Sequence, residues 1–281
     1  MTEDIHWSSY WHDSFTQTGC LPQASPAIRQ LLEAEWRELA EELAPAARVI
    51  DLACGNGAAG AVMLAANGEL DMRGVDYAQI PERPEVSFPI DSQTSIENLP
   101  FEDQSFDCAI SQFGFEYAGK GAADELVRIL AAGGRVRLAI HHRDSVLIAE
   151  NSLRREILGK LLASDFGGLV LTRDRSGLQT MFDELVKTYG QHPLVLEIAT
   201  ACRDALRLPE EKAQPPMTAI RQGMERETSL ISAMQNAAWD EADGLDFQRS
   251  TEQQIDWQPT RVLQHEDKIL CWLVSGTRKK A

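Results

Sequence analysis

Two acidic residues flank a glycine-rich stretch near residue 55. Asp51 lies in the otherwise apolar segment 49–52, which leads into Gly55-Asn56-Gly57. Glycine lets the backbone turn tightly and approach a ligand closely, and in open α/β sheets nucleotide-like ligands bind where such a strand ends. Asp76 stands 19 residues after Gly57, at the end of the next predicted strand. A carboxylate there can accept hydrogen bonds from both ribose hydroxyls, while the Asp51 charge suits an ammonium group.

The same loop also fits the fingerprint of a dinucleotide site. Residues 55–60 match the pattern GxGxxG, which is typical of NAD-binding proteins. Asp51 disfavours that interpretation, because a negative charge beside the loop would repel a diphosphate. The loop by itself leaves both hypotheses open.

A pair of histidines, His141-His142, follows the fifth predicted strand, on the side where the site should open. Histidine titrates near neutral pH, so either one can act as a general base. The alternative is that they are exposed strand-end residues or donate hydrogen bonds to loops. Adjacent strand residues point to opposite faces, so these histidines and Asp144 are not expected to bind one metal ion, and no metal site is predicted.

The hydrophobic pattern of residues 48–141 alternates between strands and helices. Proline and glycine residues punctuate it, as at Pro45 and Gly133-Gly134, and Pro81 with Pro84 excludes a regular helix in 79–85. Strands are predicted at 48–52, 71–76, 86–90, 106–111 and 135–141, and helices at 27–43, 58–66 and 122–130. This order predicts βαβ units and a doubly wound, Rossmann-like α/β sheet.

A helical insertion is predicted after the fifth strand. Its helical patterns cover 145–163, 178–189, 194–207 and 217–238, with one candidate strand at 168–171, and strands return at 246–257 and 268–277. The predicted organisation is an N-terminal cap and helix (1–44), a cofactor-binding α/β core (45–143), a helical insertion or lid (144–240) and C-terminal strands that complete the sheet (241–281).

Composition and charge narrow the class of protein. The net charge of −16 repels phosphate backbones and anionic lipids, so neither nucleic acid nor a membrane is an expected partner. The five cysteines form no CxxC pair, which favours reduced thiols. The N-terminus lacks the basic-then-apolar order of a signal peptide. These features together predict a cytoplasmic protein.

Four collinear stretches resemble the class I S-adenosylmethionine-dependent methyltransferases, nearest the small-molecule branch that includes ubiquinone-biosynthesis methyltransferases. They are VIDLACGNG (49–57), GVDY (74–77), ENLPFEDQSFDCAISQFGFEYA (97–118) and ELVRILAAGGRVRL (125–138). The resemblance covers roughly residues 45–140, with a weaker match at 228–277. Like the Asp51 charge, the third of these stretches disfavours an NAD site.

The resemblance implies a role for each matching position. Asp51 would hold the ammonium of the cofactor, and the loop glycines would allow its close approach. Asp76 would bind the ribose hydroxyls, and Tyr77 would pack on the adenine. Ser95 and Ile96 would face the adenine edge, while Ser111 would place a backbone carbonyl near the ammonium. The implied cofactor-binding set is Asp51, Ala53, Gly55, Gly57, Asp76, Tyr77, Ser95, Ile96 and Ser111.

The chain departs from the family pattern at three points. Ala53 replaces the first glycine, a change expected to cost little, and Ser95 replaces an aspartate that contacts the adenine amino group. Only 18 residues separate Asp76 from Ser95, so the helix that normally follows the second strand is missing, and that edge is open or closed by another segment. The non-functional alternatives are that the two aspartates cap helices or bind loop amides, and that Ser95 is a turn residue.

The expected activity is methyl transfer from S-adenosylmethionine to a small-molecule acceptor by in-line displacement. The helical insertion and the aromatic N-terminus, with Tyr10, Trp11 and Phe15, are candidate lids over an apolar acceptor pocket. The alternatives are an NAD-dependent oxidoreductase and a non-catalytic, methyltransferase-like binding or regulatory protein. The sequence does not indicate the acceptor, the methylated atom or the oligomeric state.

Overall fold

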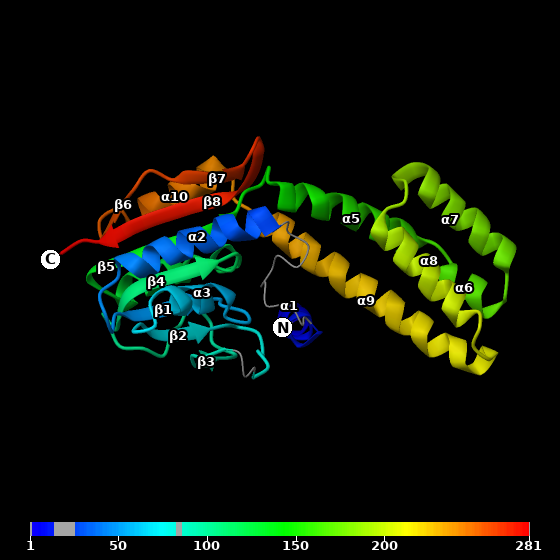
Figure 1. Ribbon diagram of the computed structural model, residues 1–281, viewed down its shortest axis with the longest axis horizontal. Coiled ribbons are helices and arrows are strands. Elements are labelled where there is room, and N and C mark those ends of the chain that lie inside the picture. Colours follow the sequence, from blue (N-terminus) through cyan, green and yellow to red (C-terminus); the bar gives the residue numbers. More distant parts are fainter. Residues whose placement is uncertain (1, 14–25, 83–85, 281) are drawn as a thin grey trace. The chain divides into compact units, whose positions relative to one another are not determined.

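The computed structural model of the chain describes residues 2–13, 26–82 and 86–280 (Figure 1). The chain divides into two units: unit 1 comprises Met1–Ile148 with Met234–Ala281, and unit 2 comprises Ala149–Ala233. Unit 1 contains a mixed β-sheet, and unit 2 is helical. The lid candidate Phe15 and the predicted helix breaker Pro84 lie outside the described residues.

Unit 1 is built on a sheet with the strand order β3-β2-β1-β4-β5-β8-β6, in which β7 also pairs with β8. Strands β1 to β5 pair in parallel with one another, and β8 is antiparallel to β5, β6 and β7. The strands are β1 (Arg48–Leu52), β2 (Asp71–Val75), β3 (Ile90–Asp91), β4 (Phe106–Gln112), β5 (Leu130–His141), β6 (Ile255–Trp257), β7 (Arg261–His265) and β8 (Lys268–Arg278). The strand order reverses beside β1, and this confirms the predicted doubly wound α/β fold.

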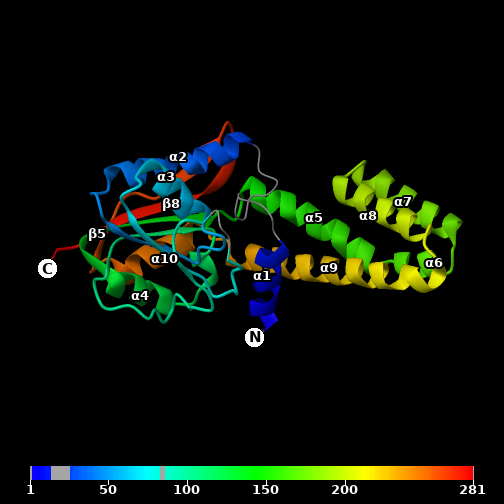
Figure 2. The same cartoon turned by 60° about the horizontal axis from the view of Figure 1, so that its bottom comes forward.

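Helices cover both faces of the sheet, and each face has its own hydrophobic core. Helices α2 (Pro26–Glu42) and α3 (Ala58–Ala66) lie on one face, and α4 (Gly121–Ile129) and α10 (Glu241–Thr251) lie on the other (Figure 2). Trp36 and Met63 fill the first core, and Leu126 fills the second. Because both faces are covered, the central strands are apolar along most of their length.

The boundary between α4 and β5 differs from the prediction. The helix ends at Ile129 and the strand begins at Leu130, so Gly133-Gly134 lies inside the strand and does not end the helix. Leu130 pairs with Phe106 and Arg135 pairs with Cys108, so five residues of β5 run beside two of β4. Gly133, with a φ of 80°, takes up part of this bulge, because glycine tolerates the left-handed region.

Two strand predictions near the ends of the sheet were wrong in extent. The third strand is confined to Ile90–Asp91 and does not include 86–89; Pro89 has no amide hydrogen to donate to a ladder. The strand predicted from residue 246 starts at Ile255, since 246–251 belong to α10. An Asp240–Asp243 capping box begins that helix.

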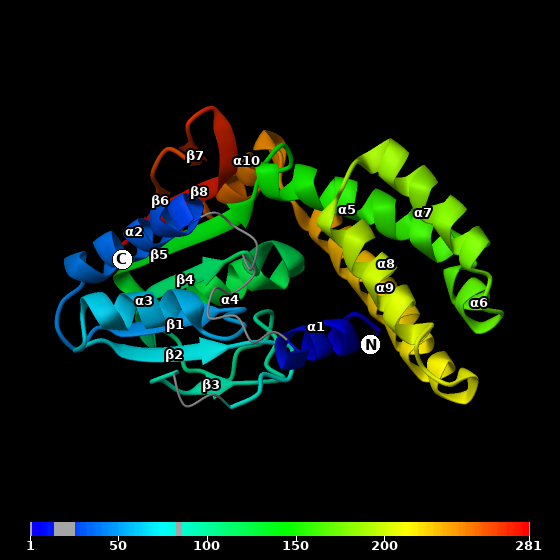
Figure 3. The same cartoon turned by 45° about the vertical axis from the view of Figure 1, so that its right-hand side comes forward.

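The N-terminal segment contains a helix that the sequence pattern did not indicate. Helix α1 (Thr2–Asp13) carries Trp11, which is buried with Ala78 and Ile80 of the loop after β2. Between β2 and β3 the described residues contain no helix. Helix α1 lies beyond the carboxyl ends of β2 and β3, against the loop that follows β2 (Figure 3).

Unit 2 consists of helices packed on their own core. They are α5 (Val146–Ala163), α6 (Phe166–Leu171), α7 (Arg175–Tyr189), α8 (Pro193–Ala205) and α9 (Glu210–Ala237). Arg154 of α5 forms an ion pair with Glu227 of α9. The strand predicted at 168–171 is helical, because Asp165 accepts a hydrogen bond from Gly168 N and caps α6. Within the described ranges, no helix is both long and apolar enough to cross a bilayer.

Replacing Trp36 by alanine should destabilise unit 1 by roughly 3–5 kcal/mol. The indole is 1% exposed, and its Nε1 donates to Gln112 Oε1 at 2.6 Å, so truncation leaves a cavity and an unpaired amide. Urea unfolding followed by near-ultraviolet circular dichroism measures the change. Arg37→Ala, on the exposed side of the same helix, should change stability by less than about 0.5 kcal/mol; equal effects of the two substitutions would contradict this assignment.

Candidate functional site

The loop after β1 turns through residues in the left-handed region. Ala53, Gly55 and Gly57 have φ angles of 53°, 53° and 76°, and Gly57 stands at the N-cap of α3. Cys54 N donates to Val75 O at 3.0 Å, which fastens the loop to the end of β2. A Cβ atom on Gly57 would lie 2.8 Å from the Phe88 ring, so glycine is required there for packing as well as for conformation.

The sequence led us to expect that alanine in place of the first glycine, at Ala53, would cost little. The backbone conformation of Ala53 shows a larger cost. Its positive φ places a Cβ atom in a conformation that costs roughly 1–2 kcal/mol for an L-residue. Gly114, in the turn after β4, leaves room for this methyl group, because a Cβ on Gly114 would lie 2.6 Å from the Ala53 Cβ. The alanine is therefore accommodated by a glycine elsewhere, at a strain cost that the motif alone did not show.

Asp51 is fully buried at the end of β1. Its Oδ2 accepts a hydrogen bond from Gly60 N at 3.3 Å, while Oδ1 is buried with no hydrogen-bond partner among the described residues. Burial raises the pKa of this carboxyl from 3.8 to about 7, and the nearby Asp76 charge adds to the shift. An orphaned carboxylate oxygen fits the ammonium of an amino-acid ligand, which would supply both the hydrogen bond and the countercharge.

Asp76 is also buried and organises two loops. Its Oδ2 accepts from Gly55 N at 2.7 Å and its Oδ1 accepts from Ala78 N at 2.8 Å. These contacts match the alternative that the aspartate binds loop amides, and they also place it beside the glycine loop. A carboxylate has further lone pairs, so the two functions are compatible.

The remaining predicted adenine contacts surround the loops after β2 and β3. The Tyr77 side chain is 54% exposed and so can pack on a ligand. Ser95 Oγ accepts from Glu97 N at 3.2 Å, as a turn residue does, while the Ile96 side chain lies in the core on the α4 face. The loop after β3 is joined to the ribose-binding candidate by a hydrogen bond from Thr94 N to Asp76 O at 2.9 Å.

Ser111 connects β1 with the turn that follows β4. Its buried Oγ donates to Leu52 O at 2.7 Å and accepts from Phe115 N at 3.1 Å. That turn, η1 (Phe115–Tyr117), carries Glu116. The serine therefore has a structural role that adds to the backbone contact implied for it.

His141 and Glu116 form a buried pair. The Glu116 Oε1 atom lies 2.6 Å from His141 Nδ1 and accepts from His141 N at 3.0 Å. Glu116 Oε2 is buried without a hydrogen-bond partner among the described residues. The Phe113 ring stacks on the imidazole with centroids 4.4 Å apart. The sequence pattern did not identify Glu116 as a site residue. It lies in the FGFEYA segment, but nothing in its spacing from His141 indicated that the two side chains would meet at the end of β5.

His142 points to the opposite face, as adjacent residues on a strand must. Its ring stacks on Trp272 at 4.3 Å, and its Nδ1 accepts from Asp144 N at 3.0 Å. Burial lowers its pKa. The structure thus separates the two candidate histidines, and only His141 shares a face with the turn after β4.

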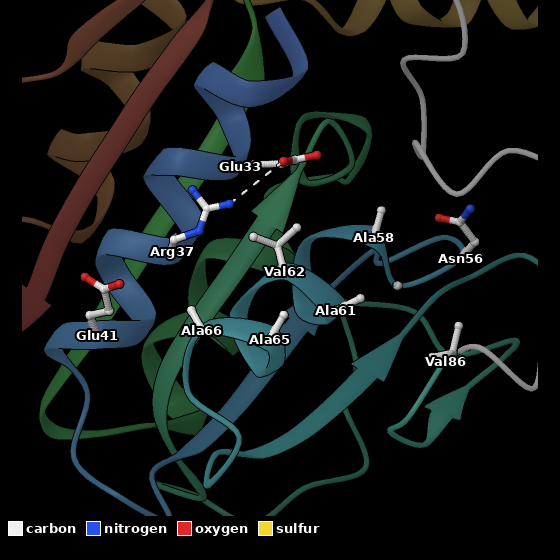
Figure 4. Close-up of a pocket in the computed structure, with 11 residues that line it drawn as sticks. Glu33, Arg37, Glu41, Asn56, Ala58, Ala61, Val62, Ala65, Ala66 and Val86 are labelled. Carbon is white, nitrogen blue, oxygen red and sulfur yellow. Dashed lines mark ion pairs between the residues drawn. The ribbon is translucent and has the colours of Figure 1, made fainter. Parts of the chain in front are cut away.

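A groove of about 670 Å³ runs beside the glycine loop, between α2 and α3 (Figure 4). Asn56 and Gly57 form one end of it, and small residues of α3 face Glu33, Arg37 and Glu41 of α2. It contains none of Asp51, Asp76 and His141. The groove therefore follows the outer helical layer and is not the candidate cofactor site.

Comparison with known proteins gives one family match and several distant structural neighbours. Residues 50–138 match a family described as a methyltransferase domain. No curated protein matches the chain. The solved N-methyltransferase NodS from Bradyrhizobium japonicum is similar, with 10% identity, 91% of this chain and 99% of that chain covered, and a TM-score of 0.45. The Burkholderia thailandensis 1,6-didemethyltoxoflavin-N1-methyltransferase, solved with S-adenosylhomocysteine, has 12% identity, 99% and 88% coverage, and a TM-score of 0.47.

A methyltransferase from Haloferax volcanii, solved with the Trm112 activator, is 21% identical over 41% of this chain, with a TM-score of 0.34. The chain spans 56% of that protein's length.

Residues 50–138 therefore carry a methyltransferase domain on a doubly wound α/β fold, and S-adenosylmethionine is the candidate methyl donor for that domain. The hypothesis of an NAD-dependent oxidoreductase, which the GxGxxG pattern left open, is set aside. Asp51 Oδ1 and the left-handed glycine loop are the structural features that fit the methionine part of the cofactor.

Asp51→Asn should weaken binding of S-adenosylhomocysteine at pH 8 by roughly ten- to a hundredfold, because a charge-assisted hydrogen bond is worth about 1.5–3 kcal/mol. In the wild-type protein the affinity should fall as the pH drops below about 7, where Asp51 becomes protonated. Calorimetric titration between pH 6 and 8 measures both effects. Asp107→Asn, at the opposite end of the parallel strands, is the matched control and should bind normally.

Asp51→Asn should leave the ligand-free protein as stable as the wild type at pH 8, or more stable by up to a few kcal/mol. Folding raises the Asp51 pKa, so its protonation stabilises the fold fully below pH 3.8, and this contribution is lost as the pH rises through about 7. Thermal unfolding at pH 8 checks this. A large loss of stability would show that the Asp51 charge serves the fold.

Proposed function

We propose that this methyltransferase acts on a small-molecule acceptor, by in-line displacement, with His141 as general base. The observation that carries the proposal is the buried His141–Glu116 pair at the carboxyl ends of β4 and β5. A histidine held by a carboxylate beside a methyl-donor site suits an acceptor that must lose a proton.

The chain's own residues would hold the cofactor at the ends of β1 and β2. Asp51 would bind its ammonium through the orphaned Oδ1, and Asp76 would bind the ribose hydroxyls while it keeps the loop amides. The backbone at Ala53, Gly55 and Gly57 would allow close approach, with Ser111 near the ammonium. Tyr77 and the backbone at Ser95 and Ile96 would border the adenine. When bound, S-adenosylmethionine supplies a methyl group already activated by its sulfonium.

His141 would take the acceptor proton at Nε2. An ionised Glu116 would accept the hydrogen bond at 2.6 Å from His141 Nδ1–H, and this would leave the lone pair on Nε2. Glu116 would also stabilise the imidazolium that forms. The backbone contact from His141 N to the same oxygen holds the carboxylate in place, so Glu116 is a positioning residue.

The surroundings of His141 support a small acceptor with an apolar body. Phe113 stacks on the imidazole, and the Tyr117 ring meets it edge-on at 6.2 Å. The net charge of −16 disfavours nucleic acid as an acceptor.

The free thiols of Cys54, Cys108, Cys202 and Cys271 support a cytoplasmic location.

His141→Gln should lower kcat by about a hundredfold or more, the usual contribution of general acid–base catalysis. Glu116→Gln should lower it by roughly tenfold, because the base remains but loses its orientation and charge support. The acceptor is first identified by screening metabolites for S-adenosylhomocysteine formation with the wild-type protein.

His142→Gln is the matched control, because this neighbour lies on the other face of β5. It should keep kcat within about threefold of the wild type. All three variants should bind S-adenosylhomocysteine normally. An unchanged kcat in His141→Gln would eliminate the general base, and an unproductive screen with small metabolites would argue against the acceptor class.

A further inference from the structure

Helix α1 contacts the loops that follow two strands of the cofactor site. Ser8 Oγ accepts a hydrogen bond from Gln79 N at 3.0 Å. Trp11, only 5% exposed, packs with Ala78 and Ile80. Trp7 meets the Tyr117 ring edge-on, with centroids 5.3 Å apart. The helix therefore bridges the loop after β2 and the turn after β4.

The Trp11 indole lies directly on the glycine loop. A Cβ atom on Gly55 would lie 2.8 Å or less from three atoms of the indole, Cζ2, Cη2 and Cε2. The amide of the same glycine donates to Asp76 Oδ2. The ring thus stands beside the carboxylate assigned to the ribose and beside the loop that follows it, so Gly55 is needed to make room for an aromatic side chain of α1.

We propose that Trp11 is a cofactor-binding residue whose indole forms a wall against the nucleoside half of S-adenosylmethionine. The inference rests on the proposed cofactor site at Asp51 and Asp76. An aromatic wall suits this half of the ligand, because the face of a nucleobase packs favourably against an aromatic ring. Between β2 and β3 the described residues contain no helix, and α1 supplies an apolar surface at this end of the strands.

The proposal also connects the cofactor with the acceptor site. The ring of Trp11 contacts that of Tyr10, with centroids 4.9 Å apart, and the Tyr10 ring contacts that of Trp7, with centroids 5.8 Å apart. Trp7 in turn contacts Tyr117, whose ring meets the His141 imidazole. A cofactor that fixes Trp11 would therefore also fix the aromatic residues beside the general base.

Calorimetric titration of the full chain with S-adenosylhomocysteine and with 5′-methylthioadenosine tests the inference. Trp11→Ala should weaken binding of both ligands by roughly tenfold or more, as loss of an aromatic–base contact does. Trp11→Phe keeps an aromatic ring and should stay within about threefold of the wild type. Circular dichroism confirms that the variants are folded.

Two further variants separate this inference from the site on which it rests. Trp257→Phe, in β6, should leave affinity unchanged, and Asp76→Ala should weaken it. If Asp76→Ala weakens binding and Trp11→Ala does not, the inference about Trp11 is overturned and the cofactor site stands. If neither has an effect, both fail. A Trp11→Ala loss confined to S-adenosylhomocysteine would place the indole on the methionine half and overturn the inference as stated.

Discussion

The hydrogen bond from the Gly55 amide to the Asp76 carboxylate holds the glycine loop against the end of β2. The other oxygen of that carboxylate accepts from Ala78 N, so one side chain shapes the loops after β1 and after β2. The parallel register of the two strands, with Leu52 opposite Val75, brings the loops to the same level. This arrangement fixes the positions of Trp11, Tyr77 and the loop after β3.

Burial of Asp51 has a cost that the free protein bears until a ligand binds. The carboxyl has one orphaned oxygen and a raised pKa near 7, because the low-dielectric interior disfavours its charge. Packing alone would favour an apolar residue at this position. A carboxylate at this position fits a cationic ligand group, and in the proposed site the ammonium of the methionine moiety would be that group.

The same logic applies at the end of β5. Glu116 is buried with one oxygen on His141 and the other without a partner among the described residues. In the proposed mechanism, this carboxylate would be the countercharge for the imidazolium of His141. Ser111 holds the turn that carries Glu116, so the acidic partner is fixed by the backbone of β1 as well as by the histidine.

The sequence by itself determined the sheet, the glycine loop, Asp51, Asp76 and the cofactor class, because these depend on local order: a buried strand, a turn and a helix in succession. Ala53 and Gly114 illustrate the limit. Each looks unremarkable in its own segment, and only their contact explains how an alanine tolerates a left-handed conformation. The choice between His141 and His142, the recruitment of Glu116 and the position of Trp11 were likewise decided by the tertiary structure. The His141–Glu116 and Trp11–Gly55 contacts join residues 25 and 44 positions apart, and no local periodicity encodes the meeting of side chains from separate loops at one edge of a sheet.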